Sequence, residues 1–553
     1  MTTLPTVTVI VVVHDDAARL PRAVASVRNQ THRAVEIVIS DDHSTDDTPK
    51  VAADLADRDR RIRVLRLERN SGGCSVPRNR ALDIARAPYV MFLDSDDELP
   101  PKAVELLLAA HAEDDVDFTM GAVERVRTDT GAHGLWMPSL FDRRRTVRGL
   151  ADEPRLLFEP LATNKMYRKE FLDRHALRFP EGLHYEDQLF SAQAYTLAHA
   201  FRIITEPVYR WYFAPYAPHA PHAPADVATL STRRHLIADV RDRVEIARRI
   251  DTFLAVHGAP PGSALREEKD YRFLAHDLRL YAGDLPYRDT AWVEGYAAEV
   301  VPYMAGLAPA AFERLGRVER AVVGLLREGR YGEARHAARG LAHGIGPRRV
   351  TVEDGRTYWG DAVPSSEAAR RDLDLTEPDL SGCPLAAAWF RHEILRVTPG
   401  PGAAVDLAVR TYDPGLRLPL APLPARVHLT PAGRRTTVPL RLDPAGRGVF
   451  EGTVRLDLAA VSLPVYGFRG VRHPVLELTE EGTAHTGVLL APLDFAPFSL
   501  PGPARHRVTV EPEARDAGRL QLHWDAQGPV GRLLGPVAQR GPVRRAARAL
   551  IRG

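Results

Sequence analysis

The chain has 553 residues, which is enough for three or four domains of ordinary size. With 44% hydrophobic and 26% charged residues it has the composition of a globular protein, and a net charge of +2 gives no reason to expect nucleic acid as a partner. Its two cysteines, Cys74 and Cys383, exclude a disulfide framework, and no apolar run approaches the ~18 residues of a membrane-spanning helix, so we predict a cytoplasmic protein.

The first hundred residues alternate between strand-like and helix-like patterns. Short apolar runs predict four strands, at residues 7–13, 35–40, 62–67 and 89–93, with helices between them. Such alternation predicts a parallel sheet with right-handed crossover connections. The first, second and fourth strands run directly into acidic residues. Because ligands bind at the carboxyl ends of the strands in such sheets, we expect the acidic clusters to converge on one crevice.

The fourth strand ends in three carboxylates, Asp94, Asp96 and Asp97. Asp94 and Asp96 flank Ser95, so an extended backbone would turn both side chains to the same face. Carboxylates crowded in this way repel one another unless a cation lies between them, and a hard divalent ion that holds a substrate's phosphates would meet that need. The alternative is a solvated acidic turn that caps the helix predicted from Pro101.

Five motifs follow one another over residues 5–215. They read VIVVVHD, EIVISDDHSTD, NSGG with RNRAL four residues later, FLDSDD and YEDQ. Together they resemble family 2 glycosyltransferases of the GT-A fold. The resemblance implies transfer of a sugar from a nucleotide diphosphate donor with inversion at the anomeric carbon. Within that family, the chain resembles the enzymes that attach N-acetylglucosamine to wall teichoic acid polymers, which carry a helical linker and β-sandwich modules after the catalytic domain.

The resemblance and the changes in pattern divide the chain into five parts. Apolar residues at helical spacing from Leu236 to Leu254 predict a helical region. From about residue 401 the period changes to two, as in Val405-Leu407-Val409, which predicts strands. We therefore expect an α/β GT-A domain with a mixed, mainly parallel sheet (1–215), a helical linker domain (216–345), a connector (346–400), an Ig-like β-sandwich (401–528) and a basic amphipathic tail (529–553).

The resemblance assigns the nucleotide to side chains at the strand ends: Val12, His14, Asp15, Asp42, Asn70, Arg78, Asp94 and Ser95. His14 and Asp15 stand where the family usually has Tyr and Asn, although an imidazole can still stack on a pyrimidine. Asp42 matches the carboxylate that accepts the imide proton of uracil, and helix capping is the alternative for Asp41 and Asp42. Arg78 matches a position near the base and the phosphates, and a surface arginine is the alternative.

Asp94 and Asp96 match the metal motif of the family. Asp94 corresponds to its ribose-side member and Asp96 to the direct ligand, so the resemblance implies Mn²⁺ or Mg²⁺ between Asp96 and the diphosphate. The ion would neutralise the charge that builds on the departing nucleotide. We expect Asp97 to cap the following helix. The domain has neither a Walker loop nor a Gly-x-Gly-x-x-Gly fingerprint, so we expect phosphate binding to depend on the metal.

The second half of the domain supplies the expected base. Asp187 matches the catalytic base of the family, which takes the proton from the attacking hydroxyl. Glu186 and Lys165 are the expected substrate contacts, and Lys165 lies in a segment that resembles the one lining the sugar site. The alternatives are an acidic helix N-terminus, stabilised by the helix dipole, for Glu186 and Asp187, and a solvated basic turn for Lys165.

Three further segments carry hypotheses without a motif. Residues 214–224 are punctuated by proline and predict a stiff linker, with His219 or His222 joining the metal site as the alternative. Residues 542–552 have a basic amphipathic pattern, for which contact with a membrane surface and docking on the protein's own β module are both open. The β module itself fits either a homo-oligomer contact or a plain structural role.

The sequence leaves two main classes of function open. The first is an inverting, metal-dependent glycosyltransferase with a nucleotide-sugar donor, for example UDP-GlcNAc, and a hydroxyl of a cell-envelope polymer or glycan as acceptor. The second is a non-catalytic scaffold that keeps the GT-A fold to bind sugar nucleotides or glycans. The joint presence of Asp42, Asp94, Asp96 and Asp187 argues against the scaffold. A nucleotidyltransferase is a weaker third reading, because no clear lysine-rich triphosphate loop is present.

Overall fold

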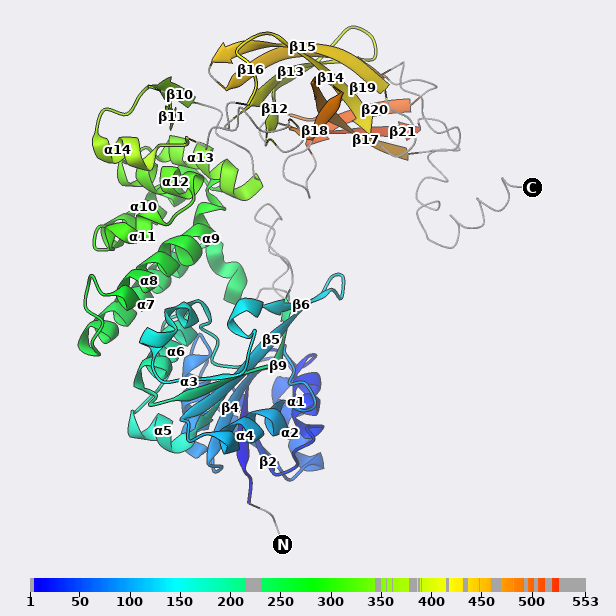
Figure 1. Cartoon of the computed structure of the whole chain (residues 1–553). Coiled ribbons are helices and arrows are strands. Elements are labelled where there is room, and N and C mark those ends of the chain that lie inside the picture. The colour runs from blue at the N-terminus through cyan, green and yellow to red at the C-terminus, as the bar shows by residue number, and fades with distance from the viewer. Residues whose placement is uncertain are drawn as a thin grey trace. The chain divides into compact units, whose positions relative to one another are not determined.

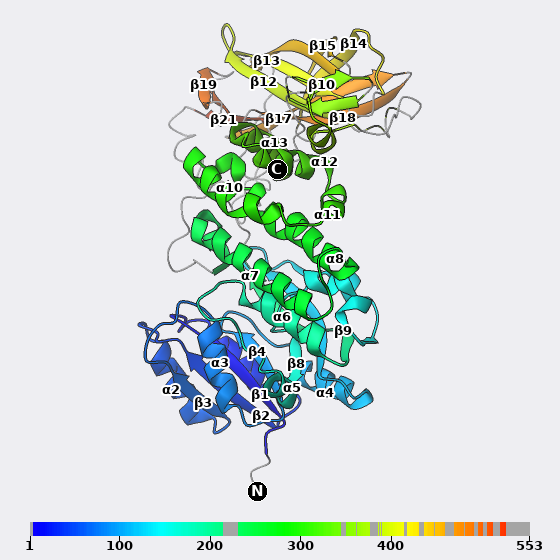
Figure 2. The same ribbon diagram turned by 90° about the vertical axis from the view of Figure 1, so that its left-hand side faces the viewer.

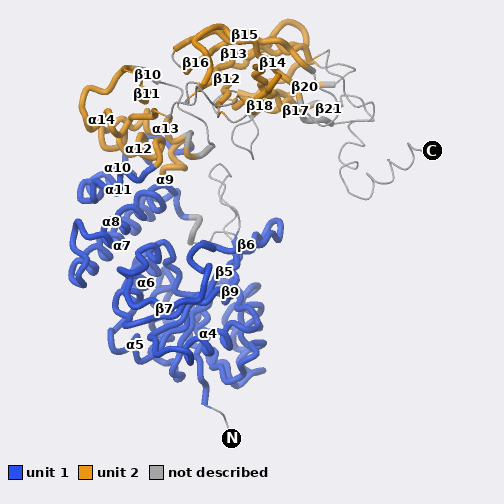
Figure 3. Tube along the Cα trace, viewed as in Figure 1, with its two compact units in different colours: residues 1–281, 287–315 blue, residues 282–286, 316–553 orange. Residues whose placement is uncertain are grey.

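The computed structural model describes residues 4–213, 230–343 and, with gaps, 350–526. The gaps in the last range are residues 355, 361, 377–384, 386–387, 389, 414–416, 431–435, 447, 459–468, 481, 492–495, 502–505 and 513–519. The chain forms two compact units, one of residues 1–281 and 287–315, the other of residues 282–286 and 316–553 (Figure 3). His219, His222 and the tail from residue 529 lie outside the described residues, so the hypotheses about them stay predictions.

A nine-stranded mixed sheet lies at the centre of the first unit (Figure 1). The strand order is β3-β2-β1-β4-β8-β5-β9-β7, and β6 pairs with β5. Strands β3, β2, β1 and β4 are parallel to one another, whereas β8 runs antiparallel to both β4 and β5. The mixed α/β fold is therefore confirmed. The bounds are β1 Val7–Val13, β2 Val35–Asp41, β3 Ile62–Arg66, β4 Tyr89–Asp94, β5 Phe118–Arg127, β6 His133–Trp136, β7 Arg145–Val147, β8 Lys165–Arg168 and β9 Phe201–Phe213.

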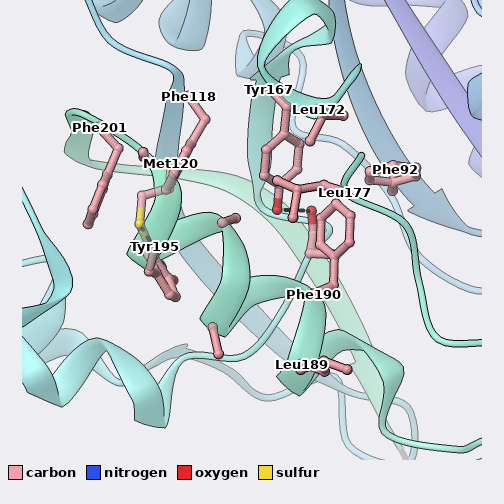
Figure 4. Close-up of a cluster of buried hydrophobic side chains, with 14 of the residues drawn as sticks. Phe92, Phe118, Met120, Tyr167, Leu172, Leu177, Leu189, Phe190, Tyr195 and Phe201 are labelled. Atoms are coloured by element: carbon pink, nitrogen blue, oxygen red, sulfur yellow. Dashed lines mark hydrogen bonds between the residues drawn. The ribbon is translucent and has the colours of Figure 1, made fainter. Parts of the chain in front are cut away.

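The helices of the domain pack on both faces of this sheet. Successive side chains of a strand point to opposite faces, so Val9 and Val11 of β1 join one apolar core while Ile10 and Val12 join the other. The second core contains Phe118, Phe190 and further aromatic side chains, among them Phe92, Tyr167, Tyr195 and Phe201 (Figure 4). The bounds are α1 Leu20–Arg28, α2 Thr48–Arg58, α3 Ser75–Ile84, α4 Ala103–Glu113, α5 Lys169–Arg174 and α6 Glu186–Leu197.

A set of helices completes the first unit, and Figure 2 shows α7 beside α6. The apolar stripe predicted for α7 is buried from Val240 to Leu254, while Leu236 precedes the helix and is exposed. A π-helix, Phe273–Leu278, separates α8 from α9. The bounds are α7 Ile237–Val256, α8 Ala264–Arg272, α9 Arg279–Ala282, α10 Thr290–Met304 and α11 Pro309–Glu313.

The second unit combines a small helical part with a large sheet that has its own apolar core. Its ten-stranded sheet has the order β14-β15-β16-β13-β12-β18-β17-β21-β20-β19. The predicted alternation is present, with Val405, Leu407 and Val409 all buried. An additional pairing of β14 with β17 closes seven of these strands into a ring, so the predicted β-rich region includes a barrel-like sheet.

The elements of the second unit have the following bounds: α12 Arg317–Arg327, α13 Tyr331–His343, β10 Val350–Glu353, β11 Arg356–Trp359, α14 Glu367–Asp372, β12 Arg391–Pro399, β13 Ala404–Tyr412, β14 Leu423–Thr430, β15 Thr436–Gly446, β16 Val449–Asp457, β17 Arg469–Glu480, β18 Thr483–Leu490, β19 Phe498–Pro501, β20 His506–Pro512 and β21 Leu520–Ala526.

Candidate active site

Three parallel strands end level with one another at one edge of the first sheet. Val13 of β1 is paired with Asp41 of β2, and Val12 is paired with Asp94 of β4. The residues that follow these strands therefore leave the sheet side by side, as expected for the carboxyl edge of a parallel sheet. Val12 itself has its side chain in the apolar core, so only its backbone is near this edge.

His14, Asp42 and Asn70 meet at the ends of β1 and β2. Asp42 is buried, and its carboxylate accepts hydrogen bonds from the Ser71 backbone N–H (3.0 Å) and the Ser71 hydroxyl (2.9 Å). His14 Nδ1 lies 3.0 Å from the Asp42 carbonyl oxygen, and the Asn70 amide nitrogen lies 2.8 Å from His14 Nε2. The structure thus brings His14, Asp42 and Asn70 together, and Ser71 fixes the Asp42 carboxylate beside them.

Asp15 has a local structural task beside this group. Its φ of +45° is a left-handed conformation that is uncommon for residues other than glycine. Its carboxylate accepts a hydrogen bond from the Thr45 backbone N–H (2.6 Å), which is the main cause of the lowered pKa of Asp15. The loop after β1 is therefore tied to the loop after β2, and Asp15 itself is directed at that loop.

Asp96 is a crowded carboxylate after β4. Burial, and after it the neighbouring Asp94 carboxylate, raise the pKa of Asp96 to about 6. The cation nearest to it is Arg19, whose Nη1 lies 3.6 Å from Asp96 Oδ2. Crowded carboxylates of this kind, with one arginine 3.6 Å away, fit a divalent cation. Among the described residues no group of three or more His, Cys, Asp or Glu side chains could hold a metal ion, so an ion at Asp96 would need most of its ligands from the donor or water.

Ser95 and Asp97, on either side of Asp96, have hydrogen-bond partners that could not be predicted from the sequence. Ser95 donates a hydrogen bond to Asp16 Oδ2 (2.6 Å). Asp97 is buried and accepts hydrogen bonds from the Tyr209 hydroxyl (2.6 Å) and the Tyr212 backbone N–H (2.8 Å). The prediction that Asp97 caps the next helix is wrong, because α4 begins only at Ala103 without a side-chain cap and Asp97 instead ties β4 to β9.

Arg78 joins the two halves of the candidate site. Its side chain is 3% exposed, so the alternative of a surface arginine is wrong. Nη2 donates to Asp94 Oδ1, and Nη1 donates to both Glu186 Oε1 and Asp187 Oδ1, each at 2.7 Å. One buried guanidinium therefore connects the end of β4 to the start of α6. Three carboxylates around one cation leave the cluster with an excess of negative charge when all are ionised.

Glu186 and Asp187 form the first turn of α6, as the alternative of an acidic helix N-terminus predicts. Burial raises the pKa of Glu186 to about 7. Burial also raises the pKa of Asp187, against the opposing effect of Arg78. The Asp187 side chain is 20% exposed and that of Glu186 10%, and Asp187 Oδ2 also accepts a hydrogen bond from the Ala162 backbone N–H (3.3 Å). Asp187 is the more open of the two carboxylates.

Lys165 does not reach the surface. Its side chain is fully buried, and Nζ donates to Glu159 Oε2 (2.5 Å), to Asn164 Oδ1 (3.0 Å) and to the Leu161 carbonyl oxygen. Direct contact with a sugar would require these bonds to break, so the structure does not support Lys165 as a substrate contact. A solvated basic turn is excluded for the same reason. Glu159 also accepts a hydrogen bond from Tyr195 of α6 (2.6 Å), so Lys165 belongs to the support of that helix.

Asp16 and Arg19 are site residues that the sequence reading missed. Asp16 is buried and accepts hydrogen bonds from Ser95 and from Arg19 Nε (2.8 Å). The only local signal for Asp16 is its place directly after Asp15 at the end of a strand. Arg19 carries no such signal, because an arginine at a helix start is ordinarily solvated.

Comparison with known proteins identifies the segment that carries the strand-end part of this site, and Glu186 and Asp187 lie beyond that segment. Residues 8–176 match the family model Glycosyl transferase family 2. This segment is a family 2 glycosyltransferase domain.

No helix of the described residues is long and apolar enough to cross a membrane.

Three relatives show how far the similarity extends. The chain is 28% identical to EpsH of Bacillus subtilis over 271 residues, 46% of this chain and 76% of EpsH. It is 31% identical over 190 residues to TarP of Staphylococcus aureus, a poly(ribitol-phosphate) beta-N-acetylglucosaminyltransferase, and this match covers 34% of the chain and 56% of TarP. The structural match to the crystal structure of S. aureus TarS covers 95% of this chain and 86% of the TarS chain. Its TM-score of 0.50 at 17% sequence identity shows a shared fold.

Proposed function

We propose that the protein is an inverting, metal-dependent glycosyltransferase that moves a sugar from a nucleotide diphosphate donor to a hydroxyl of a cell-envelope polymer. The observation that carries the proposal is the Arg78 cluster, because it brings the strand-end carboxylate Asp94 and the Glu186–Asp187 pair into one site. A donor-side acidic motif and a separate base are the two parts that an inverting transfer needs.

The first part of the proposed site holds the nucleotide. Asp42 Oδ1 accepts one hydrogen bond from the Ser71 N–H, and Oδ2 accepts bonds from that N–H and from the Ser71 hydroxyl. Oδ1 therefore keeps a further lone pair for a donor such as the imide N–H of uracil. His14 and Asn70 border the same position. Asp96, with Asp94 beside it, would hold Mn²⁺ or Mg²⁺, which when bound supplies positive charge for the departing diphosphate.

Asp187 is the proposed base. It is the more exposed of the two carboxylates in the first turn of α6, and its second oxygen is oriented by the Ala162 N–H. An inverting transfer needs one carboxylate to take the proton from the attacking hydroxyl. Arg78 is directed at carboxylates, so we propose that it acts by orienting Asp94 and Asp187 and not by contact with the phosphates. Glu186, on the same guanidinium, would orient its neighbour or the acceptor.

The sugar, the nucleotide and the acceptor are the finest level of the proposal. We propose N-acetylglucosamine as the sugar and a teichoic-acid-like polymer as the acceptor, because TarP is named as a poly(ribitol-phosphate) beta-N-acetylglucosaminyltransferase. We propose UDP as the nucleotide because Asp42 matches the carboxylate that accepts the imide proton of uracil. The aligned segment covers only 56% of TarP, so this substrate pair is carried over as a hypothesis. The proposed cytoplasmic location, the contact of the tail with a membrane surface and the homo-oligomer through the β module have the same standing.

Nucleotide release measured with and without acceptor tests the proposed function. UDP-GlcNAc and a panel of other nucleotide-sugars are incubated with Mn²⁺ and a short hydroxylated polymer acceptor, and released UDP and the anomeric configuration of the product are measured. We expect release that the acceptor stimulates and a product of inverted configuration. Donor binding without any release would support a binding scaffold, and pyrophosphate release from a nucleoside triphosphate and a sugar phosphate would support a nucleotidyltransferase.

A further inference from the structure

The residue before the Glu186–Asp187 pair has a strained backbone. Tyr185 has φ +67° and ψ +27°, which is the left-handed region that bulky side chains rarely adopt. Such conformations persist only where the surrounding structure holds them, and they gather at functional sites. The start of α6 is therefore held by contacts from outside the helix.

The contacts on Tyr185 come from α7. Its hydroxyl donates a hydrogen bond to Asp239 Oδ2 (2.7 Å), and the guanidinium of Arg243 lies 3.5 Å from the centre of its ring. The Tyr281 hydroxyl donates to the same Asp239 oxygen (2.6 Å). Asp239 and Arg243 are both buried, so these are interior contacts. The ring of Tyr185 is thus fixed at its face by Arg243 and at its tip by Asp239.

A second set of contacts holds the residue that follows the pair. Gln188 Oε1 accepts a hydrogen bond from Arg272 Nη1 (2.9 Å), and Arg272 forms an ion pair with Asp277 (2.8 Å). Asp277 also forms an ion pair with Arg243 (2.5 Å), so the two sets of contacts are one network. Asp277 lies in the π-helix Phe273–Leu278. Such π-helical turns are rare in proteins, and those that occur are often found at functional sites.

This network is balanced in charge and almost free of solvent. Arg243 and Arg272 supply two positive charges, and Asp239 and Asp277 two negative ones, with all four side chains buried. Burial opposes the ionisation of Asp277, but Arg272 and Arg243 outweigh it and hold its pKa well below the usual range. Buried ion pairs contribute little net stability compared with apolar side chains of the same shape. Stability alone therefore does not explain why the start of α6 is held by charged residues.

We propose that Tyr185, Asp239, Arg243, Arg272 and Asp277, here called the α6 support cluster, position the Glu186–Asp187 pair for catalysis. The inference rests on the proposed function in that Asp187 is taken as the base. It makes α7 and the π-helix part of the supporting structure of the active site, although all five sequence motifs precede them in the chain. Small displacements of a reacting group lower rates strongly, so loosening this cluster should reduce turnover before it unfolds the protein.

The first test is Tyr185→Phe in the full-length protein, which keeps the ring under Arg243 and removes the hydroxyl that bonds to Asp239 (2.7 Å) and contacts the Tyr281 hydroxyl (3.4 Å). We expect kcat for acceptor-dependent nucleotide release to fall by about 10-fold, with KM for the donor and the affinity for free UDP unchanged. Amide hydrogen exchange at residues 186–190 should become faster. Arg272→Met should have the same two effects through Gln188, and Arg272→Lys, which keeps the charge, should restore part of kcat.

Tyr303→Phe is the matched control. The Tyr303 hydroxyl donates to Asp251 Oδ2 (2.7 Å) in a second buried charged network and accepts a hydrogen bond from Lys269 of α8. The variant therefore loses a tyrosine-to-aspartate bond of the same type, together with the bond from Lys269. We expect this variant to lower Tm without changing kcat or exchange in α6. If Tyr185→Phe and Arg272→Met change only Tm, as the control does, the positioning role is overturned while the activity of the parent keeps the proposed function.

The two proposals can fail separately. If the parent protein releases no nucleotide from any donor, the proposed function fails, and hydrogen exchange still decides the support cluster. Faster exchange at residues 186–190 in Tyr185→Phe, without the same change in Tyr303→Phe, then supports a cluster that fixes the start of α6. Equal exchange in the two variants overturns it.

Discussion

Arg78 is the residue on which the candidate site depends. A single guanidinium with two terminal nitrogens serves three carboxylates, and its own side chain is almost completely buried. Removal of one partner from a buried ion pair leaves uncompensated charge and typically costs ~3–5 kcal/mol. Arg78 is therefore both a structural and an electrostatic requirement of the site, and a lysine, with one nitrogen, cannot replace its geometry.

The Glu186–Asp187 pair can be separated by two isosteric variants. Asp187→Asn keeps the shape of the side chain but cannot accept a proton, so we expect kcat to fall by roughly 10²–10⁴-fold while donor affinity stays near that of the parent. Glu186→Gln should have a milder effect. The rate of the chemical step is measured under single-turnover conditions, and the affinity for UDP is measured by calorimetry.

The pH dependence of the parent adds a second measurement on the acidic cluster that contains Asp187, in which Glu186 and Asp96 also have raised pKa values. Burial raises the pKa of Asp187, and a base works only in its deprotonated form, so the rate should rise as pH increases through that raised pKa. If the Glu186→Gln variant is inactive and the Asp187→Asn variant is active, the base is Glu186. Parent-like rates in both variants would remove the pair from the chemistry.

Asp96 is the residue that we expect to link the protein to a metal. Asp96→Ala should abolish turnover that depends on Mn²⁺, because the remaining motif has Asp94 already engaged by Arg78. The affinity for the free nucleoside without metal should change little, since Asp42 and its neighbours are untouched. A titration of activity against Mn²⁺ checks this, and a variant that keeps the manganese response of the parent would show that the ion binds elsewhere.

At the scale of elements, the pairing of β5 with β9 determines where the far side of the site lies. The register between these strands shifts between Met120 and Ala122, where Gly121 lies, and again between Ala122 and Val123, and β9 carries the tyrosines that hold Asp97. A Cβ added at Gly121 would lie 2.6 Å from Val208 Cγ1 and 2.8 Å from the Glu206 carbonyl oxygen. Glycine is required here by the close approach of the second strand.

Gly121→Ala should therefore destabilise the first unit. Overpacking of this kind typically costs ~1–3 kcal/mol, and backbone oxygen cannot move away as easily as a flexible side chain. Gly134→Ala in β6 is the matched control, because a Cβ there meets nothing within 4 Å. Chemical denaturation of the two variants measures the difference, and equal midpoints would show that the β5–β9 contact adapts without cost.

At the scale of the whole molecule, the candidate site and the barrel-like sheet belong to different compact units. The site residues lie in the first unit, and the sheet of the second unit has an apolar core of its own. An independent core means that the first unit does not rely on the sheet for its interior. The helices α7 and α8, in contrast, belong to the same unit as the site.

Deleting residues 401–553 should leave transfer to a short acceptor largely intact. Action on a long polymer, or assembly of the protein, should weaken if the β-rich region binds the polymer or a second copy. A chain that ends at residue 236 is the informative comparison, because it removes Asp239, Arg243 and Arg272 and should lose turnover. Rates on short and long acceptors, with circular dichroism as a check of folding, measure these effects; loss of short-acceptor transfer in a folded 1–400 chain would place part of the active site in the β-rich region.

The sequence by itself determined the features that depend on local pattern. The bounds of β1, β2 and β4 follow from short apolar runs, and the carboxylates that end them follow from the residues that come next. The alternation of apolar and polar residues from residue 405 predicted the β-rich region in the same way. These predictions hold because the hydrophobic period of a strand and the chemistry at its end are properties of neighbouring residues.

Only the tertiary structure decided which of these residues meet and which are buried. Arg78 and Glu186 are 108 residues apart, and their ion pair depends on how α3 and α6 pack on the sheet. The burial of Lys165, the bond from Tyr209 to Asp97 and the closure of the β-rich sheet by β14 and β17 are likewise contacts between distant segments. A sequence pattern states what a side chain prefers, whereas its partner depends on the packing of elements far apart in the chain, and that packing places the proposed base, Asp187, on the same guanidinium as Asp94.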